Sequence, residues 1–237
     1  MSPSVPKSLL LAAIGWWRPG AGYWPRRVRR HALIAAGALG LTAALAIAPR
    51  AGPAVFRVSL GTGYAALLLL GLSLALGPLN VLRGRPNPVS SDLRRDVGIW
   101  TAVFGLAHVI SGALVHMGGR VWPYFFYPAD QPHRFPLRHD PFGAANWLGL
   151  GATMVLVLLL AISNDLSLRR LGTPRWKALQ RWNYALAALT LLHGAAYQLV
   201  ESQKWPFVLL LAATATAALL LQGAGFLRIR RSSEPIA

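Results

Sequence analysis

The chain of 237 residues contains no cysteine and few acidic residues, with 7 aspartates and glutamates compared with 24 lysines and arginines. Without cysteine it forms no disulfide, no thiolate metal site and no iron–sulfur cluster of its own. Charged residues make up only 13% of the sequence, too few for a soluble domain of useful size. Any redox chemistry in this protein therefore needs a bound cofactor.

Sequence signatures of common catalytic sites are also lacking. There is no phosphate-binding loop, no HExxH pattern and no serine nucleophile elbow. The glycine pairs Gly61 with Gly63 and Gly149 with Gly151 lie in or at apolar segments and follow no predicted strand, so they form no dinucleotide fingerprint. The chain has no visible nicotinamide or flavin domain.

What the chain has in abundance is apolar sequence, with 54% hydrophobic residues. Six segments approach the roughly 20 residues that cross a bilayer. They lie near residues 31–49, 60–82, 97–117, 145–163, 182–201 and 206–227. We therefore expect an all-α integral membrane bundle of six transmembrane helices over residues 31–227, after an interfacial segment 1–30 and before a basic tail 228–237.

The distribution of charge predicts the orientation of this bundle. If the amino terminus is cytoplasmic, the inner segments hold 18 of the 24 basic residues and the outer segments hold six. Positive charge concentrates on the cytoplasmic side of membrane proteins. Both termini are therefore expected in the cytoplasm, and the net charge of +17 is explained by the lipid bilayer without a nucleic-acid partner.

Two histidines, His108 and His193, each lie inside an otherwise uncharged apolar stretch. Arg95 precedes the first by 13 residues and Arg181 precedes the second by 12, which places both imidazoles roughly 18–20 Å from the same membrane face. Two histidines at one height in a helix bundle are what a haem iron needs for axial ligation from both sides. The alternative is two neutral imidazoles, each bonded to a neighbouring helix.

This depth lies past the middle of the membrane, toward the outside. The propionates of a haem there would need donors or cations, and the nearest in sequence are His116, Arg120, Trp122, Arg134 and Arg138. These residues are equally typical of ordinary interfacial anchors. His31, at the start of the first segment, is interpreted as an interfacial residue.

Two further interpretations stay open at this point. A haem-free scaffold or transporter would use the histidines for bonds between helices. A metalloreductase would reduce ferric or cupric ions at the proline-rich outer loop 118–144, where His133 and His139 lie, although their spacing matches no compact metal motif and also suits a solvated loop.

Three stretches of sequence resemble a known family. They are Pro78–Leu79, LRRDVGIWTAVFGLAH leading to His108, and SNDLSLRRLGTPRWKALQRWNYALAALTLLH ending at His193. Over roughly residues 60–200 the chain resembles the ferric-reductase-like transmembrane domain family. Within it, the chain is most similar to haem-binding membrane subunits of bacterial periplasmic methionine-sulfoxide reductase systems.

The resemblance implies a six-helix haem b protein of the bacterial plasma membrane. Such a protein receives electrons on the cytoplasmic side, from a flavin reductase or a quinol, and passes them to a reductase outside. His108 and His193 match the ligand positions, whereas Gln180 stands where many members have histidine. We therefore expect an electron-transfer subunit with one haem b, in which a quinol or a flavin is the donor. With two axial nitrogens the iron has no open site, which favours electron transfer over oxygen activation.

Overall fold

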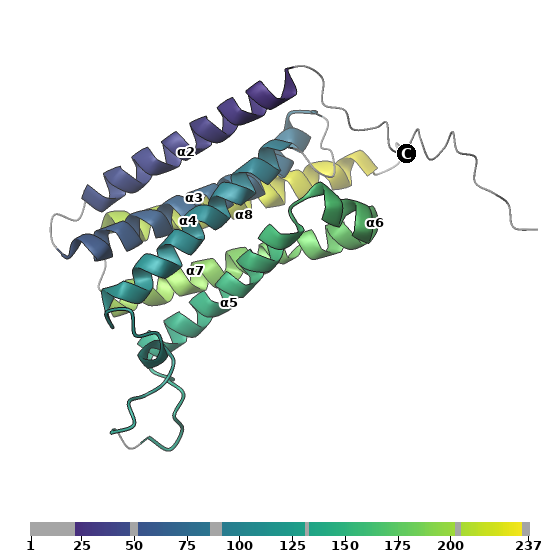
Figure 1. Ribbon diagram of the computed structural model, residues 1–237. Helices are drawn as coiled ribbons and strands as arrows, with labels where there is room; N and C mark the ends of the chain where they lie inside the picture. The colour runs from purple at the N-terminus through teal and green to yellow at the C-terminus, as the bar shows by residue number, and fades with distance from the viewer. Residues whose placement is uncertain (1–21, 48–51, 86–91, 131–132, 202–204, 234–237) are drawn as a thin grey trace, which may run out of the picture.

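The computed structural model describes residues 22–47, 52–85, 92–130, 133–201 and 205–233, and most of these residues are helical (Figure 1). The α-helices are α2 (Tyr23–Ile47), α3 (Ala54–Leu82), α4 (Asp92–Val115), α5 (Pro141–Ile162), α6 (Asp165–Gln180), α7 (Trp182–Val200) and α8 (Trp205–Ser233), with a short 3₁₀ helix, η1 (Trp122–Tyr124). Within the described ranges no strand forms, and one isolated β-bridge joins Phe126 to Leu137. The predicted all-α class is confirmed.

The six apolar segments correspond to α2, α3, α4, α5, α7 and α8. The described residues of each segment lie within the matching helix or directly after its last residue. All of these except α7 are long and apolar enough to cross a membrane, so the protein is a multi-pass membrane protein. The 19 residues of α7 are less apolar because they include Asn183, His193 and Gln198. Helices also extend beyond the expected core, since α2 begins at Tyr23 and α8 ends at Ser233; residues 1–21 lie outside the described residues.

Local sequence explains where two of the helices begin and one bends. Asp140 caps α5, accepting a hydrogen bond from the Gly143 backbone N–H at 2.7 Å. Asn164 caps α6 in the same way through Ser167. Helix α6 breaks at Gly172, whose φ of 72° is a left-handed conformation that favours glycine. The part of α6 after this break runs to Gln180 and leads directly into α7.

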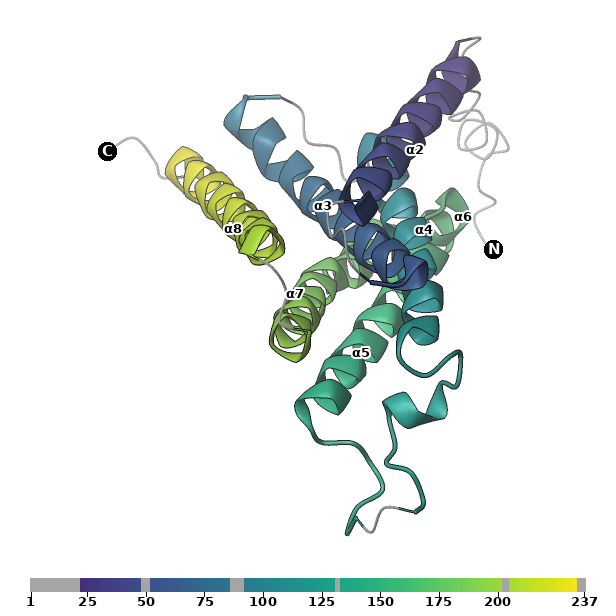
Figure 2. The same ribbon diagram turned by 90° about the vertical axis from the view of Figure 1, so that its left-hand side faces the viewer.

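Helix α3 lies in the middle of the bundle, with α8 and α2 on different sides of it (Figure 2). It is apolar around its whole circumference, as expected for a helix with neighbours on every side. Three hydrophobic clusters share it: one with α4, α5 and α7, one with α2 and α4, and one with α8. Gly61 allows the close approach of α2, because a Cβ there would lie 2.5 Å from the Thr42 carbonyl oxygen.

A buried carboxylate attaches α2 to α4. Asp96 is fully buried, and its oxygens accept bonds from Arg27 at 3.0 Å and from the Arg30 Nε at 2.6 Å. His31 Nε2 lies 3.2 Å from the same carboxylate, while its Nδ1 accepts a bond from the Trp100 indole. The indole only donates, so this contact requires an unprotonated Nδ1 and an N–H on Nε2. His31 is therefore part of an interhelical ion cluster as well as lying near the helix start.

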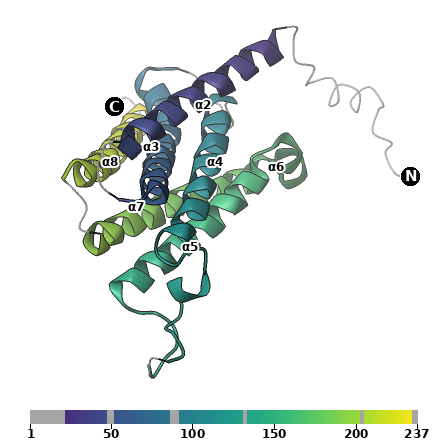
Figure 3. The same cartoon turned by 60° about the vertical axis from the view of Figure 1, so that its left-hand side comes forward.

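The two ends of the bundle differ in charge. The start of α2, the end of α8 and helix α6 lie at one end, which we name the α6 end (Figure 1). The α4–α5 loop projects from the opposite end, named the loop end (Figures 1 and 3). Of the 20 lysines and arginines among the described residues, 16 belong to the α6 end. This asymmetry matches the one expected from the sequence.

Candidate functional site

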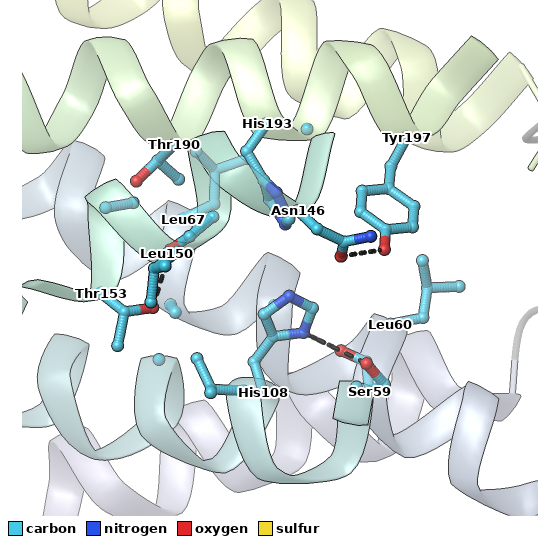
Figure 4. A pocket seen from close by; sticks show the side chains of 18 of the residues that line it. Ser59, Leu60, Leu67, His108, Asn146, Leu150, Thr153, Thr190, His193 and Tyr197 are labelled. Atoms are coloured by element: carbon cyan, nitrogen blue, oxygen red, sulfur yellow. Dashed lines mark hydrogen bonds between the residues drawn. The ribbon is translucent and has the colours of Figure 1, made fainter. Parts of the chain in front are cut away.

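His108 on α4 and His193 on α7 point toward one another across the middle of the bundle (Figure 4). Their ring centroids lie 6.0 Å apart, and the ring planes are 76° from each other. Two imidazole nitrogens that share one metal ion lie roughly 4 Å apart, at about 2 Å each. Since each ring centre lies about 1 Å beyond its nitrogen, the observed separation is close to that of a shared ion. The equal height expected from the spacing of these two residues is found.

The second nitrogen of each ring is held by a backbone carbonyl. His108 Nδ1 lies 2.8 Å from the Ser59 carbonyl oxygen on α3, and His193 Nδ1 lies 2.8 Å from the Ala145 carbonyl oxygen on α5. A carbonyl only accepts, so each Nδ1 carries the proton and each Nε2 keeps its lone pair. Metal-binding histidines are typically oriented in this way.

Two glycines clear the space that these rings occupy. A Cβ at Gly63 would lie 2.8 Å from His108 Nδ1, and a Cβ at Gly149 would lie 2.8 Å from His193 Nδ1. Each glycine follows the accepting carbonyl by four residues, so the pairs α3–α4 and α5–α7 repeat one local pattern. In the sequence, the visible sign of these positions is the two glycine pairs, Gly61 with Gly63 and Gly149 with Gly151, which form no dinucleotide fingerprint.

The two histidines line a cavity of about 360 Å³, here named the histidine cavity. Most of its lining is apolar, including leucines of α3, α5, α7 and α8. Toward the loop end it becomes polar: Tyr197 donates to Asn146 at 2.8 Å, and Gln198 donates to Tyr64 at 2.7 Å. The residues present fit a flat, apolar metal macrocycle with a polar edge, because ligand nitrogens, cleared space and lining all suit it.

Among the residues expected to contact propionates, only His116 lines the histidine cavity. Its Nε2 pairs with Glu201 at 2.9 Å. Arg138 is bound to Asp140, and this hydrogen bond holds the pKa of Asp140 below its usual range. The remaining three contact other groups: Arg120 the Met117 carbonyl, Trp122 the ring of Phe126, and Arg134 the ring of Phe135.

The histidines of the outer loop pack on one aromatic ring. His133 stacks on Tyr127 with centroids 3.6 Å apart, and His139 meets the same ring edge-on at 5.4 Å. Over the described part of the chain, no three or more histidine, aspartate or glutamate side chains form a group that could hold a metal ion. The loop therefore offers no metal cluster within those residues.

A second cavity, of about 490 Å³, lies toward the α6 end and includes Gln180. Its lining includes four cations and no carboxylate: Arg94, Arg95, Lys177 and Arg181. It shares Leu70, Thr101, Leu156 and Leu186 with the histidine cavity. One layer of side chains therefore separates the two cavities.

The chain matches the family described as "Ferric reductase like transmembrane component" over residues 62–192. This match includes His108 and ends one residue before His193. No solved structure matches the chain.

Three curated relatives carry the name "Protein-methionine-sulfoxide reductase heme-binding subunit MsrQ". The protein of Ralstonia nicotianae is 32% identical over 57% of this chain and 56% of its own length. That of Deinococcus radiodurans is 33% identical over 56% of this chain and 58% of its own. That of Yersinia pseudotuberculosis serotype O:1b is 27% identical over 62% of this chain and 65% of its own length. The match thus spans 56–65% of the length of these relatives.

Proposed function

Because this chain belongs to the family of ferric reductase like transmembrane components, we propose that it carries electrons across a membrane through one haem b held between His108 and His193. One observation carries the proposal: two imidazoles face each other at 6.0 Å, each with its Nδ1 bonded to a carbonyl. Both Nε2 lone pairs are left for a metal between the rings.

The names of the relatives support a haem and a partner reductase. They are haem-binding subunits of a methionine-sulfoxide reductase system. By analogy, this chain is expected to serve such a reductase at the loop end. With both imidazoles as its ligands, a haem here would serve electron transfer, and the substrate would be reduced by the partner reductase.

Each residue of the site has a defined task in this proposal. When bound, the haem supplies one-electron chemistry. His108 and His193 would hold it, and the carbonyls of Ser59 and Ala145 fix the ring orientation and raise the basicity of Nε2. The apolar lining excludes water and lowers the local dielectric, which tunes the reduction potential.

The proposed direction of transfer follows from the charge distribution. Six crossings by α2, α3, α4, α5, α7 and α8 would leave the start of α2 and the end of α8 on the same side, at the α6 end. The 16 cations of this end support a location in the cytoplasm, with the protein in a bacterial-type inner membrane. A quinol or flavin in the second cavity would then be the donor on that side. The electron would tunnel through the thin side-chain layer that the two cavities share, toward the loop end.

The test is a visible difference spectrum, dithionite-reduced minus oxidised, of the purified protein. Wild type should show a low-spin bis-histidine haem with one haem per chain. His108→Ala and His193→Ala should each lose it, whereas the outer-loop control His139→Ala should keep it. Haem-free wild type would favour the scaffold interpretation, and unchanged spectra in both cavity variants would refute the ligand assignment.

A further inference from the structure

We propose that His116 and Glu201 form a strap between α4 and α7 that holds the two axial histidines at the separation needed to share one iron. The strap deepens the proposed function and rests on it. Its two residues are positioning residues, because they are argued to act through His108 and His193.

Helices α4 and α7 need such a connection because they do not pack on one another. In the described residues α4 packs on α2, α3 and α5, and α7 packs mainly on α5, with smaller contacts to α3, α6 and α8, and the histidine cavity lies between α4 and α7. The ring pair His108–His193 and the contact between His116 Nε2 and the Glu201 carboxylate connect the two helices across this cavity. The described residues show no backbone contact between α4 and α7, and the hydrophobic cluster that both helices enter, through Ala102 and Leu186, lies on the α6 side of the two histidines.

The position of the strap matches that of the ligands. His116 follows His108 by eight residues, and Glu201 follows His193 by eight. Two helical turns, about 12 Å, therefore separate the His116–Glu201 contact from the ligand pair on both helices. The strap lies at the loop end of the same cavity, and both of its residues line that cavity.

Both ends of the strap are fixed on ordered backbone. The His116 backbone N–H donates to the Tyr124 hydroxyl at 3.1 Å, and its ring meets Phe142 edge-on at 5.3 Å. Glu201 ends α7, and its own N–H donates to the Tyr197 carbonyl at 2.9 Å. Because both side chains start from fixed points, the 2.9 Å contact constrains the distance between the helices.

The strength of this pair decides the size of the expected effect. The side chains of His116 and Glu201 retain 30% and 21% of their exposure, so the pair is partly screened by water. We expect its loss to raise the equilibrium constant for separating one imidazole from the iron about fivefold, which corresponds to about 1 kcal/mol.

Carbon monoxide is the probe for this separation, because it binds ferrous haem only after one axial imidazole leaves. In the reduced purified protein, His116→Ala and Glu201→Ala should each speed CO binding about fivefold, with His139→Ala as the outer-histidine control. If the two residues act through their contact, the double variant should also give about fivefold and not the product of the two effects. Unchanged rates, or fully multiplicative ones, would overturn the strap.

A distance measurement separates failure of the strap from failure of the proposed function. The chain has no cysteine, so spin labels at Leu114→Cys on α4 and Leu199→Cys on α7 report one distance only. In haem-free protein, Glu201→Ala and Glu201→Gln should broaden and lengthen this distance, while labels at Val157→Cys and Leu192→Cys, on the packed pair α5–α7, should not respond. An unaltered α4–α7 distance refutes the strap even where haem binding is intact.

Discussion

At the scale of single residues, each imidazole of the histidine cavity is oriented by the backbone of a second helix. The carbonyls of Ser59 and Ala145 fix the proton on Nδ1, and Gly63 and Gly149 leave the space in which the rings lie. A side chain can be exchanged by mutation, whereas a carbonyl cannot. The orientation of both rings is therefore a property of the helix pairs and is tested best through the glycines.

Gly63→Ala and Gly149→Ala should weaken haem retention roughly tenfold, as expected for overpacking worth 1–3 kcal/mol. The added Cβ would lie 2.8 Å from a ligand ring and displace it. The measurement is the rate at which haem transfers from each variant to a haem-free acceptor protein. Gly40→Ala on α2, where no heavy atom lies within 4 Å of the new Cβ, is the control and should retain haem like wild type. Retention as in wild type in both glycine variants would contradict the crowding argument.

The sequence predicted the two histidines but not their surroundings. His108 and His193 are conspicuous because each is an ionisable side chain inside an otherwise uncharged apolar stretch. The partners Gly63 and Gly149 are separated from their histidines by more than 40 residues, and only the packing of α3 on α4 and of α5 on α7 joins them. Periodicity within one helix carries no information about such a contact.

At the scale of elements, α2 is the most loosely packed of the helices around α3, and the Asp96 cluster compensates for this. The carboxylate is fully buried and contacts Arg27, Arg30 and His31 of α2. The basic run at the start of α2 indicated only a membrane face. Its second role was not predictable, since Asp96 lies 69 residues after Arg27 in sequence.

Asp96→Asn should destabilise the protein by about 3 kcal/mol, because removing one partner of a buried ion cluster leaves the remaining charges uncompensated. Asp92→Asn is the matched control, since the Asp92 carboxylate is 37% exposed and its contact with Arg30 is long, at 4.0 Å. It should cost no more than about 0.5 kcal/mol. Thermal unfolding in detergent, followed by tryptophan fluorescence, measures both. Equal stabilities of the two variants would show that the cluster does not secure α2.

The start of α5 offers a pH-dependent test. Asp140 caps α5 and binds Arg138, and this bond lowers the pKa of the carboxyl. Because the pKa of Asp140 is lower in the folded protein, its ionised carboxylate stabilises the fold at pH values above the ordinary pKa of about 3.9. This contribution is lost as the pH falls through the pKa of the folded state. Asp140→Ala should therefore cost about 1 kcal/mol at neutral pH and less at pH 3. Asp130→Ala, an exposed carboxylate of the same loop, should change stability little at either pH. If Asp140→Ala lowered the stability by the same amount at both pH values, the loss would come from packing and not from the charge of the carboxylate.

At the scale of the whole molecule, two helix pairs of similar design enclose one cavity. The pairs α3–α4 and α5–α7 each supply a histidine, an accepting carbonyl and a glycine. The all-helical class, the positions of the apolar helices and the charge asymmetry were predictable, because hydropathy and basic residues are properties of composition along the chain. The two cavities and the thin layer between them arise from tertiary packing, which the sequence pattern does not encode locally.

Orientation in the membrane is the molecular property that the proposed electron path requires. The cations at the α6 end predict that this end faces the cytoplasm, with the α4–α5 loop outside. Single cysteines at Val121 in the loop and at Leu166 on α6, both exposed, are unique labelling sites in this chain. A membrane-impermeant maleimide added to intact spheroplasts should modify Val121→Cys at once and Leu166→Cys only after lysis. The reverse pattern would invert the direction of electron transfer, and labelling of both before lysis would show that the two ends do not lie on opposite sides.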